Sequence, residues 1–480
     1  MKEEIKSLTL TYKDARIAFF WKCVEYTGLL LFLALIPRMM GPQLYGDFAL
    51  LLSIIVLLVF SNALGGMPTF GRFIPEFKVK GEIASIRGVF TQFIILRLIL
   101  AAPVILFFLG LNSYFQWVIN NKILISLSLT YIFGIISLSC YQLFYGLNKM
   151  GRYLFHGSST RILLVFLLLI YGGAVDIEKA SYMLVGVELF LSCVLVFFAR
   201  KYFSLAAAIK YSSSFYSQLS FGLAFFVSNF LLMLIWRSGE AIISLYSVGS
   251  EQVAFYNLSN SMFLAINALF AQVGTILLPS INAMHSLGDS NRRDDWLGGL
   301  FTYTVVLSFV VLIAINSIGA FVFELLLGGG YSEAFSNFKV LSICLLPLSV
   351  IRLGQTVALV HSRPKDNFLI SLITLFVFSV SVILLTEEYG AFGVSLSVVM
   401  AFFASSFFSY YHFNLSEVLK VTDLGKVVGV GCFCLGIIEL SVLPKEVTGS
   451  IVLLTFIVLM FLMKIINRKE ISRMFKKDAL

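Results

Sequence analysis

The sequence predicts an all-α polytopic membrane protein with about fourteen transmembrane helices, arranged as two six-helix lobes of like orientation plus a C-terminal helix pair. Three observations predict this class: the composition, the apolar runs and an internal repeat. Hydrophobic residues make up 59% and charged residues 13% of the 480 residues, and the mean hydropathy is +0.94. A soluble domain has about 45–50% apolar and about 25% charged residues. A chain this apolar is expected in a bilayer.

Fourteen apolar runs approach the length of about 20 residues that a helix needs to cross a bilayer. The first contains Lys22 and Glu25 and has no small-residue cleavage site after it, so we expect a retained helix and not a signal peptide. The predicted spans are 17–37, 45–64, 88–110, 122–145, 159–175, 181–200, 217–237, 252–278, 299–323, 337–360, 367–386, 390–412, 425–443 and 447–466.

Two stretches, 38–82 and 236–289, share one plan of a helix end, a turn at glycine, a long apolar helix and a polar loop. The pairs lie 207 or 208 positions apart and comprise Gly41 with Gly249, Gly81-Glu82 with Gly288-Asp289, Phe48 with Tyr256, Leu50 with Leu258, and Ser53 with Ser261. Six spans per half give both halves the same orientation, as in transporters whose repeats are related by an axis along the membrane normal.

The repeat predicts the domain organisation. We expect an N-terminal six-helix lobe over 1–200, a cytoplasmic linker over 201–216 and a second six-helix lobe over 217–412. The linker is rich in Ser and Tyr between basic ends, and we expect it to lie in the membrane interface as a short helix. An extra helix pair and a basic cytoplasmic tail follow over 413–480.

The distribution of Lys and Arg sets the predicted orientation. With a cytoplasmic N-terminus, the inside segments hold 26 of the 35 Lys and Arg residues, the outside segments hold 6, and three lie inside spans. This bias follows the positive-inside rule and places both termini in the cytoplasm. The net charge of +9 therefore marks the cytoplasmic face, and no nucleic-acid partner is expected.

Several function classes are disfavoured by what the sequence lacks. The six cysteines lie inside apolar runs without the paired spacings of disulfides or zinc sites, and the four histidines are scattered in loops or helix ends. We expect no metal, no cofactor and structurally neutral histidines, His156 among them. No loop exceeds about 25 residues, which is shorter than the roughly 50 residues of a folded domain. A membrane glycan polymerase or ligase is therefore the least favoured reading, and the protein is not expected to be an enzyme.

Charged residues inside spans are costly and are candidates for function. Lys22 and Glu25 share a helix face, as either a pair lining a central cavity or an intrahelical pair near the cytoplasmic surface. Arg97 and Arg352 lie deep in their spans and either face the cavity or make structural bonds between helices. Glu188 is either protonatable or bonded to a neighbouring helix.

Arg237 and Glu240 end the seventh span, where they either form an interfacial cap or serve the cavity. If Lys22, Arg97 and Arg352 face one cavity, that cavity is cationic at membrane depth. Arginine binds phosphate in a bidentate manner, so we expect an anionic headgroup such as a diphosphate, with Arg237 as a further contact. Glu25 and Glu188 are the candidate residues for coupling to a proton or sodium ion.

Three stretches carry a resemblance to a known family over about residues 10–412. GPQLYGDFALLLSI, RSGEAIISLYSVGSEQVAFYNLSNS with LLPSINAMHSLGD, and FELLLGGGYSEAFSNFKVLSICLLPLSVIRLGQT resemble the polysaccharide transport family of O-antigen flippases. That family belongs to the multidrug/oligosaccharidyl-lipid/polysaccharide exporter (MOP) superfamily. Glu240 stands where the family often has Asp, which preserves the charge. The final helix pair is similar to the extra pair of lipid II flippases.

The resemblance implies a MATE-like inverted V of two lobes around a central cavity. It implies alternating-access translocation of an undecaprenyl-diphosphate-linked oligosaccharide, such as an O-antigen repeat unit for lipopolysaccharide, across the bacterial inner membrane. Its partners would be the lipid-linked oligosaccharide, membrane lipids and the glycan polymerase and chain-length machinery. A multidrug or cation antiporter of the same superfamily is the alternative, and it would need acidic residues to dominate the cavity.

Overall fold

The computed structural model is helical throughout the residues that it describes, which are 12–117, 120–171, 175–210, 212–246, 249–286, 290–360, 364–415, 421–441, 443–463 and 465. Eleven helices among them are long and apolar enough to cross a membrane. The prediction of an all-α, multi-pass membrane protein is confirmed. The chain forms two compact units, Met1–Ala254 (unit 1) and Phe255–Leu480 (unit 2), and each is described by itself.

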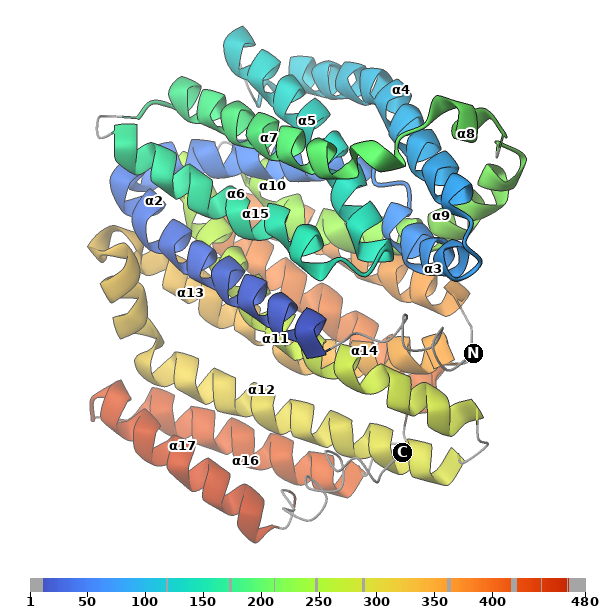
Figure 1. The fold of residues 1–480 in the computed structure, drawn as a ribbon. Coiled ribbons are helices and arrows are strands. Elements are labelled where there is room, and N and C mark those ends of the chain that lie inside the picture. Colours follow the sequence, from blue (N-terminus) through green and yellow to red (C-terminus); the bar gives the residue numbers. More distant parts are fainter. Residues whose placement is uncertain are drawn as a thin grey trace. The chain divides into compact units, whose positions relative to one another are not determined.

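The helices of unit 1 follow one another through short connections (Figure 1). They are α2 (Tyr12–Ser61), α3 (Gly66–Val79), α4 (Ile83–Phe115), α5 (Asn121–Gly146), α6 (Met150–Tyr171), α7 (Ile177–Ala199), η1 (Arg200–Tyr202), α8 (Leu205–Lys210), α9 (Ser212–Arg237) and α10 (Gly239–Leu245). The helix α11 (Ser250–Ser286) begins in unit 1 and continues into unit 2.

Unit 2 continues with α12 (Ser290–Leu327), η2 (Gly329–Tyr331), α13 (Ser332–Ser342), α14 (Leu345–Val360), α15 (Pro364–His412), α16 (Val421–Leu440) and α17 (Lys445–Leu462). The helices α2 and α15 each cover two predicted spans and bend at a glycine. The predicted span 425–443 corresponds to α16, which carries Asp423, Lys426 and Glu439 and is not among the eleven apolar helices.

The bend in α2 lies at Gly41, one of the two glycines that mark the internal repeat. Its φ is 75° and that of its repeat partner Gly249 is 103°, values that an L side chain rarely adopts. Glycine at both positions lets the chain turn between two membrane helices. The other predicted partner, Gly288-Asp289, and the basic tail beyond residue 465 lie outside the described residues.

The interior of unit 1 is aromatic. Phe70 on α3, Phe93 on α4 and Phe144 on α5 are fully or almost fully buried in one cluster, and the rings of Phe70 and Phe93 meet edge to face at 4.9 Å. A second contact ties α6 to α2, since the Ser158 hydroxyl donates to the backbone oxygen of Trp21 at 2.9 Å. These contacts fix the helices that carry the charged residues described below.

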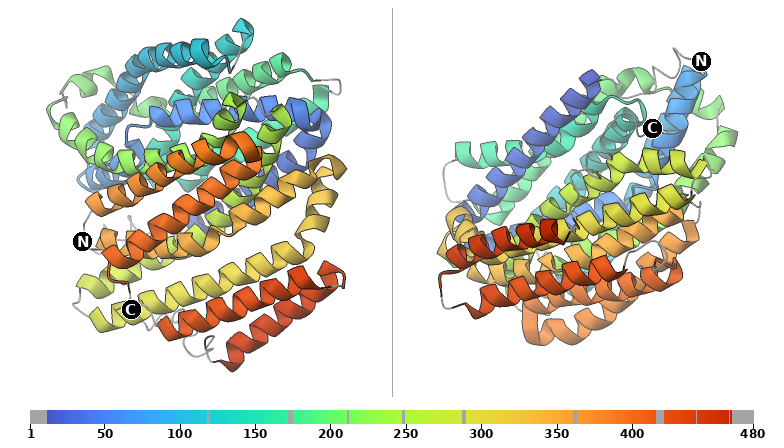
Figure 2. Two further views of the ribbon diagram at one scale, coloured as in Figure 1. Left: turned by 180° about the vertical axis from the view of Figure 1, so that it is seen from behind. Right: turned by 90° about the horizontal axis from the view of Figure 1, so that it is seen from below.

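In unit 2 the last two helices pack against α12, side by side with it in both views (Figures 1 and 2). Phe309 of α12 and Phe456 of α17 lie 6.1 Å apart in a buried cluster that also contains Ile438 of α16. Glycines permit the close approach: a Cβ on Gly431 would lie 2.3 Å from the Phe309 ring. Small residues at such contacts are typical of helix packing in membranes.

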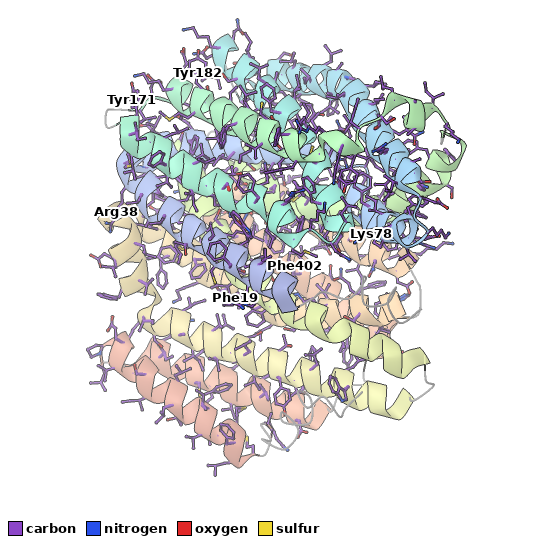
Figure 3. The ribbon with its side chains drawn as sticks, viewed as in Figure 1. Phe19, Arg38, Lys78, Tyr171, Tyr182 and Phe402 are labelled. Atoms are coloured by element: carbon purple, nitrogen blue, oxygen red, sulfur yellow. The ribbon has the colours of Figure 1, made fainter. Side chains whose placement is uncertain are left out.

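Two helices differ from the sequence prediction in unit 1. The predicted loop 65–87 contains α3, and α6 begins at Met150 instead of residue 159. Figure 3 shows Arg38, Tyr171 and Tyr182 toward one end of the helices of unit 1 and Lys78 toward the other. The predicted topology assigns these two ends to opposite faces of the membrane.

Candidate functional site

Arg97 is fully buried at the middle of α4 and is held by α5 and by the turn between α2 and α3. Its guanidinium donates to the Ser139 hydroxyl and to Oε1 of Gln142, both at 2.8 Å, and to the backbone oxygen of Ala63. Its side chain has no exposed surface. The reading of Arg97 as a cavity-facing residue is therefore corrected: in this structure it makes the structural bond between helices that was the alternative. The physical reason is that buried donors need partners, and α5 supplies them.

Lys22 and Glu25 form an ion pair on α2. The Lys22 Nζ and Glu25 Oε2 atoms are 2.8 Å apart, and the two side chains are 40% and 26% exposed. The contact is the intrahelical pair expected of residues three apart on one helix face. Both side chains keep enough exposure to meet a solute or lipid headgroup.

Arg161 is a charged residue that the sequence analysis missed, because it is the third residue of the predicted span 159–175 and was counted with the cytoplasmic segment before it. Since α6 begins at Met150, Arg161 lies 11 residues into a helix of 22 residues, about 16 Å along its axis. Its charge interacts with Glu25 on α2, with Arg237 on α9 and with Tyr45 on α2. If the polar residues of GRYLFHGSST had been included in the span, with the helix starting at Met150, Arg161 would have been placed inside the membrane.

Arg237 ends α9, and its backbone is tied to α2. The hydroxyl of Ser53 is 2.5 Å from the backbone oxygen of Arg237 and 3.2 Å from Oε2 of Glu240, which is fully buried at the start of α10. The guanidinium of Arg237 is half-buried and forms no ion pair with the residues that the structure describes. Arg237 is thus fixed through its main chain, and its guanidinium group is available to bind an anion.

We call Lys22, Glu25, Arg161 and Arg237 the cationic cluster. It comes from α2, α6 and α9 within unit 1. Glu25 is already paired with Lys22, and within the described part of the chain neither Arg161 nor Arg237 has an ion-pair partner. Two half-buried guanidinium groups without carboxylate partners can bind an anion, and phosphate oxygens match their fork geometry.

Glu188 on α7 lies in a separate polar group of unit 1. Its Oε1 is 2.8 Å from Nε2 of His156 on α6, and the His156 ring stacks on Tyr141 of α5 at 5.5 Å. Glu188 is 8% exposed. Glu188 therefore bonds to a neighbouring helix, which was one of the two alternatives for this residue. His156 was expected in a loop or at a helix end, and it lies within α6 because that helix begins earlier than predicted.

Arg352 belongs to unit 2 and lies on α14. Its Nη2 donates to the side-chain oxygen of Asn267 on α11 and to the backbone oxygen of the same residue at 3.2 Å. Its Nη1 is buried without a hydrogen-bond partner within the described chain. A guanidinium with a buried, unsatisfied N–H group retains capacity for a further acceptor. In the described ranges, no three His, Cys, Asp or Glu side chains gather as a metal site.

Comparison with solved structures identifies the fold. The structure is similar to lipid II flippase MurJ in its inward closed conformation, with a TM-score of 0.71 and 14% identity over 95% of this chain and 100% of that one. It is also similar to an inward-facing multidrug resistance MATE family transporter of the MOP superfamily, with a TM-score of 0.62 and 11% identity over 82% and 94% of the two chains.

A third neighbour is the Vibrio cholerae MATE transporter VcmN, with a TM-score of 0.51 and 13% identity over 84% of this chain and 97% of that one. No protein-family model and no curated protein sequence matches the chain. The chain therefore has the fold of MOP-superfamily exporters, which confirms the expected fold class and the suspected likeness to flippases and exporters at the level of fold.

Proposed function

We propose that the chain is a flippase that moves an undecaprenyl-diphosphate-linked oligosaccharide from the cytoplasmic to the outer leaflet of the bacterial inner membrane. The observation that carries this proposal is the pair Arg161 and Arg237, two half-buried cations that form no ion pair with any carboxylate that the structure describes. The likeness to lipid II flippase MurJ over the whole of that chain supports it at the level of fold.

The chemistry of the cationic cluster favours a lipid diphosphate. Charge–charge attraction is stronger in the poorly solvated membrane interior than in water, and Arg binds phosphate through paired N–H donors. We assign cargo contact to Lys22, Arg161 and Arg237 in unit 1. A cargo role for Arg352, which belongs to unit 2, remains a prediction from the sequence. No chemical step is required. In alternating access, the occupied site opens first to one side of the membrane and then to the other.

The remaining features of the proposal come from the sequence. The lobes would extend over 1–200 and 217–412, joined by the linker 201–216, with both termini in the cytoplasm. The glycan is an O-antigen or another surface polysaccharide repeat unit, and polymerase and chain-length proteins would receive it at the outer leaflet.

A multidrug or cation antiporter is the second candidate, favoured by the likeness to the MATE transporters. A cationic drug would need carboxylates to dominate its site. In the cationic cluster, Lys22, Arg161 and Arg237 outnumber Glu25, and that carboxylate is already paired. The cluster would therefore repel a cation.

The decisive experiment deletes the gene and locates the lipid-linked oligosaccharide with a membrane-impermeant glycan-modifying reagent on spheroplasts. We expect it to accumulate out of reach on the cytoplasmic leaflet, and wild-type protein to restore access. An Arg161→Gln, Arg237→Gln double variant should fail to restore it, whereas Arg87→Gln, which removes an exposed cation of unit 1, should restore it. Drug sensitivity of the deletion strain with normal surface glycan would support the antiporter instead.

A further inference from the structure

A pocket in unit 1 lies where the beginning of α2 meets α6 and α7, and its lining includes no residue of the cationic cluster. Its volume is about 310 Å³, and it is lined by Trp21, Gly151, Arg152, Phe155, Leu195 and Phe198. We propose that this pocket binds an anionic glycerophospholipid of the cytoplasmic leaflet, with its phosphate on Arg152 and Trp21 and an acyl chain along the aromatic wall.

Two unsatisfied donors face the headgroup position. Arg152 forms no ion pair and no side-chain hydrogen bond with any residue that the structure describes, and its guanidinium lies over Phe198 at 4.7 Å and Phe144 at 5.6 Å. The Trp21 indole N–H likewise has no acceptor within the described chain. A guanidinium and an indole N–H at one pocket form a donor set for a phosphate oxygen.

The pocket admits Trp21 because residue 151 is glycine. A Cβ there would lie 3.0 Å from the Ile17 side chain and 3.3 Å from Nε1 of Trp21, so a larger residue would push α2 away. The Trp21 ring then meets Phe155 edge to face at 5.6 Å. With Leu195, these rings make an apolar wall that continues from the donors and suits an acyl chain.

The surroundings favour a lipid over a soluble anion. The apolar side chains Phe19, Phe20 and Phe197 are 72%, 60% and 56% exposed, as expected of a surface that faces acyl chains. Lys149 and Lys201 lie close to the pocket residues in sequence, and their Nζ atoms lie 5.7 and 5.2 Å from the centre of the Tyr202 ring. The lining residues that the structure describes include no acid, so a headgroup of net negative charge is favoured over a zwitterionic one.

The leaflet follows from the predicted topology. The pocket lies near the start of α2, the start of α6 and the end of α7, all of which the charge bias assigns to the cytoplasmic side. Cytoplasmic leaflets carry the anionic lipids to which basic membrane-proximal residues bind. The proposal does not rest on the cargo of the transporter, because the pocket uses none of the residues of the cationic cluster.

The test uses Trp21 as its own reporter. In the full-length chain, Trp117, Trp236 and Trp296 are replaced by Phe, and the protein is reconstituted with increasing fractions of brominated phosphatidylglycerol or brominated phosphatidylcholine. We expect brominated phosphatidylglycerol to quench Trp21 fluorescence at a lipid fraction about tenfold lower than brominated phosphatidylcholine requires. This difference corresponds to about one charge-assisted hydrogen bond. Arg152→Gln should remove this difference, and Arg200→Gln, the matched control outside the pocket lining, should preserve it.

Equal quenching by the two lipids in the unmodified Arg152 protein, or equal behaviour of the Arg152→Gln and Arg200→Gln variants, would overturn the proposal. If Arg152→Gln does not fold, Arg152→Lys is compared with Arg200→Lys, and only the former should weaken the selectivity. Displacement of phosphatidylglycerol by inorganic phosphate would identify a free-anion site, and preferential displacement by undecaprenyl diphosphate would identify a cargo site. Either result would reject the phospholipid assignment.

Discussion

A Cβ atom on Gly66 would lie 2.3 Å from Nη2 of Arg97, so the guanidinium occupies the space that a side chain at position 66 would need. The same Cβ would lie 2.4 Å from Oε1 of Gln142, which accepts a hydrogen bond from Arg97. Gly66 thus allows α3 to approach the Arg97 network closely. The arrangement is that of a packed structural contact, in which Nη1 and Nη2 of Arg97 have acceptors and only its Nε is left without one among the described residues.

Gly66→Ala should destabilise the protein by about 1–3 kcal/mol, the usual cost of overpacking a filled interior. The neighbours are the guanidinium and amide of the buried network and have little freedom to move. Unfolding is followed in detergent by heat or denaturant. Gly110→Ala on α4 is the control, because a Cβ there meets no atom within 4 Å. Equal stability of the two variants would show that the Arg97 network can rearrange around a larger side chain at position 66 without lowering the free energy of unfolding.

Arg97→Gln should lower stability by about 1–3 kcal/mol, the cost typical of leaving buried polar groups without their hydrogen-bond partner. The Ser139 and Gln142 side chains and the Ala63 carbonyl would lose their donor. We expect low abundance in the membrane, with normal transport per folded molecule. A folded Arg97→Gln protein that fails to export glycan would instead return Arg97 to the cargo path.

Arg161→Gln and Arg237→Gln should each leave stability nearly unchanged and weaken binding of the lipid diphosphate about ten- to a hundredfold, the worth of one charge-assisted hydrogen bond. Their guanidinium groups make no ion pair that the protein would lose within its described part. Affinity is measured with purified protein and undecaprenyl diphosphate, with Arg87→Gln as control. Arg161→Lys should retain part of the affinity, since it keeps the charge but not the fork. Unchanged affinity in both Gln variants would exclude the cationic cluster as the cargo site.

The class of fold was predictable because membrane insertion depends on length and apolarity, which the sequence states directly. The turn glycines Gly41 and Gly249 were predictable as well, since their positive φ values demand that residue type. Helix starts were harder, because polar residues inside a span lower its hydropathy. Because the segment before Arg161 is polar, the start of α6 was predicted too late in the sequence. For the same reason, His156 was predicted to lie outside the span.

The partners of the buried charges were not predictable from one chain. Arg97 in FIILRLIL has the same local appearance whether it faces a cavity or a neighbouring helix. The distinction is made by Ser139 and Gln142, which lie 42 and 45 positions away and come together with it only in the fold. The local sequence shows that a charged residue lies in an apolar span, where burial is energetically costly. The residues that offset this cost become known only from the tertiary structure.

The His156–Glu188 pair should link flux to proton binding if Glu188 couples transport to a gradient. Glu188→Gln keeps a hydrogen-bonding side chain beside His156 but removes the titratable carboxylate. We expect this variant to fold and to lose the dependence of flux on a pH gradient across proteoliposomes, while Glu178→Gln, in the first turn of α7, keeps it. Flux of the wild-type protein that responds to neither a proton nor a sodium gradient would remove the coupling role of Glu25 and Glu188.

The docking of α16 on α12 should depend on Gly431. A Cβ on this residue would lie 2.3 Å from the fully buried Phe309 ring, whereas a Cβ on Gly429 of the same helix meets no atom within 4 Å. Gly431→Ala should therefore cost about 1–3 kcal/mol, and Gly429→Ala little.

Cys434 provides a local probe of this interface, because it is 3% exposed in the same buried cluster. With the other five cysteines replaced by Ser, a thiol-reactive fluorogenic dye reports when α16 leaves α12 on heating. Gly431→Ala should lower that transition temperature, by about 2–4 °C for each kcal/mol in a unit of this size, relative to Gly429→Ala. Identical transitions would mean that Phe309 rotates aside and that the helix pair is held by its apolar area alone.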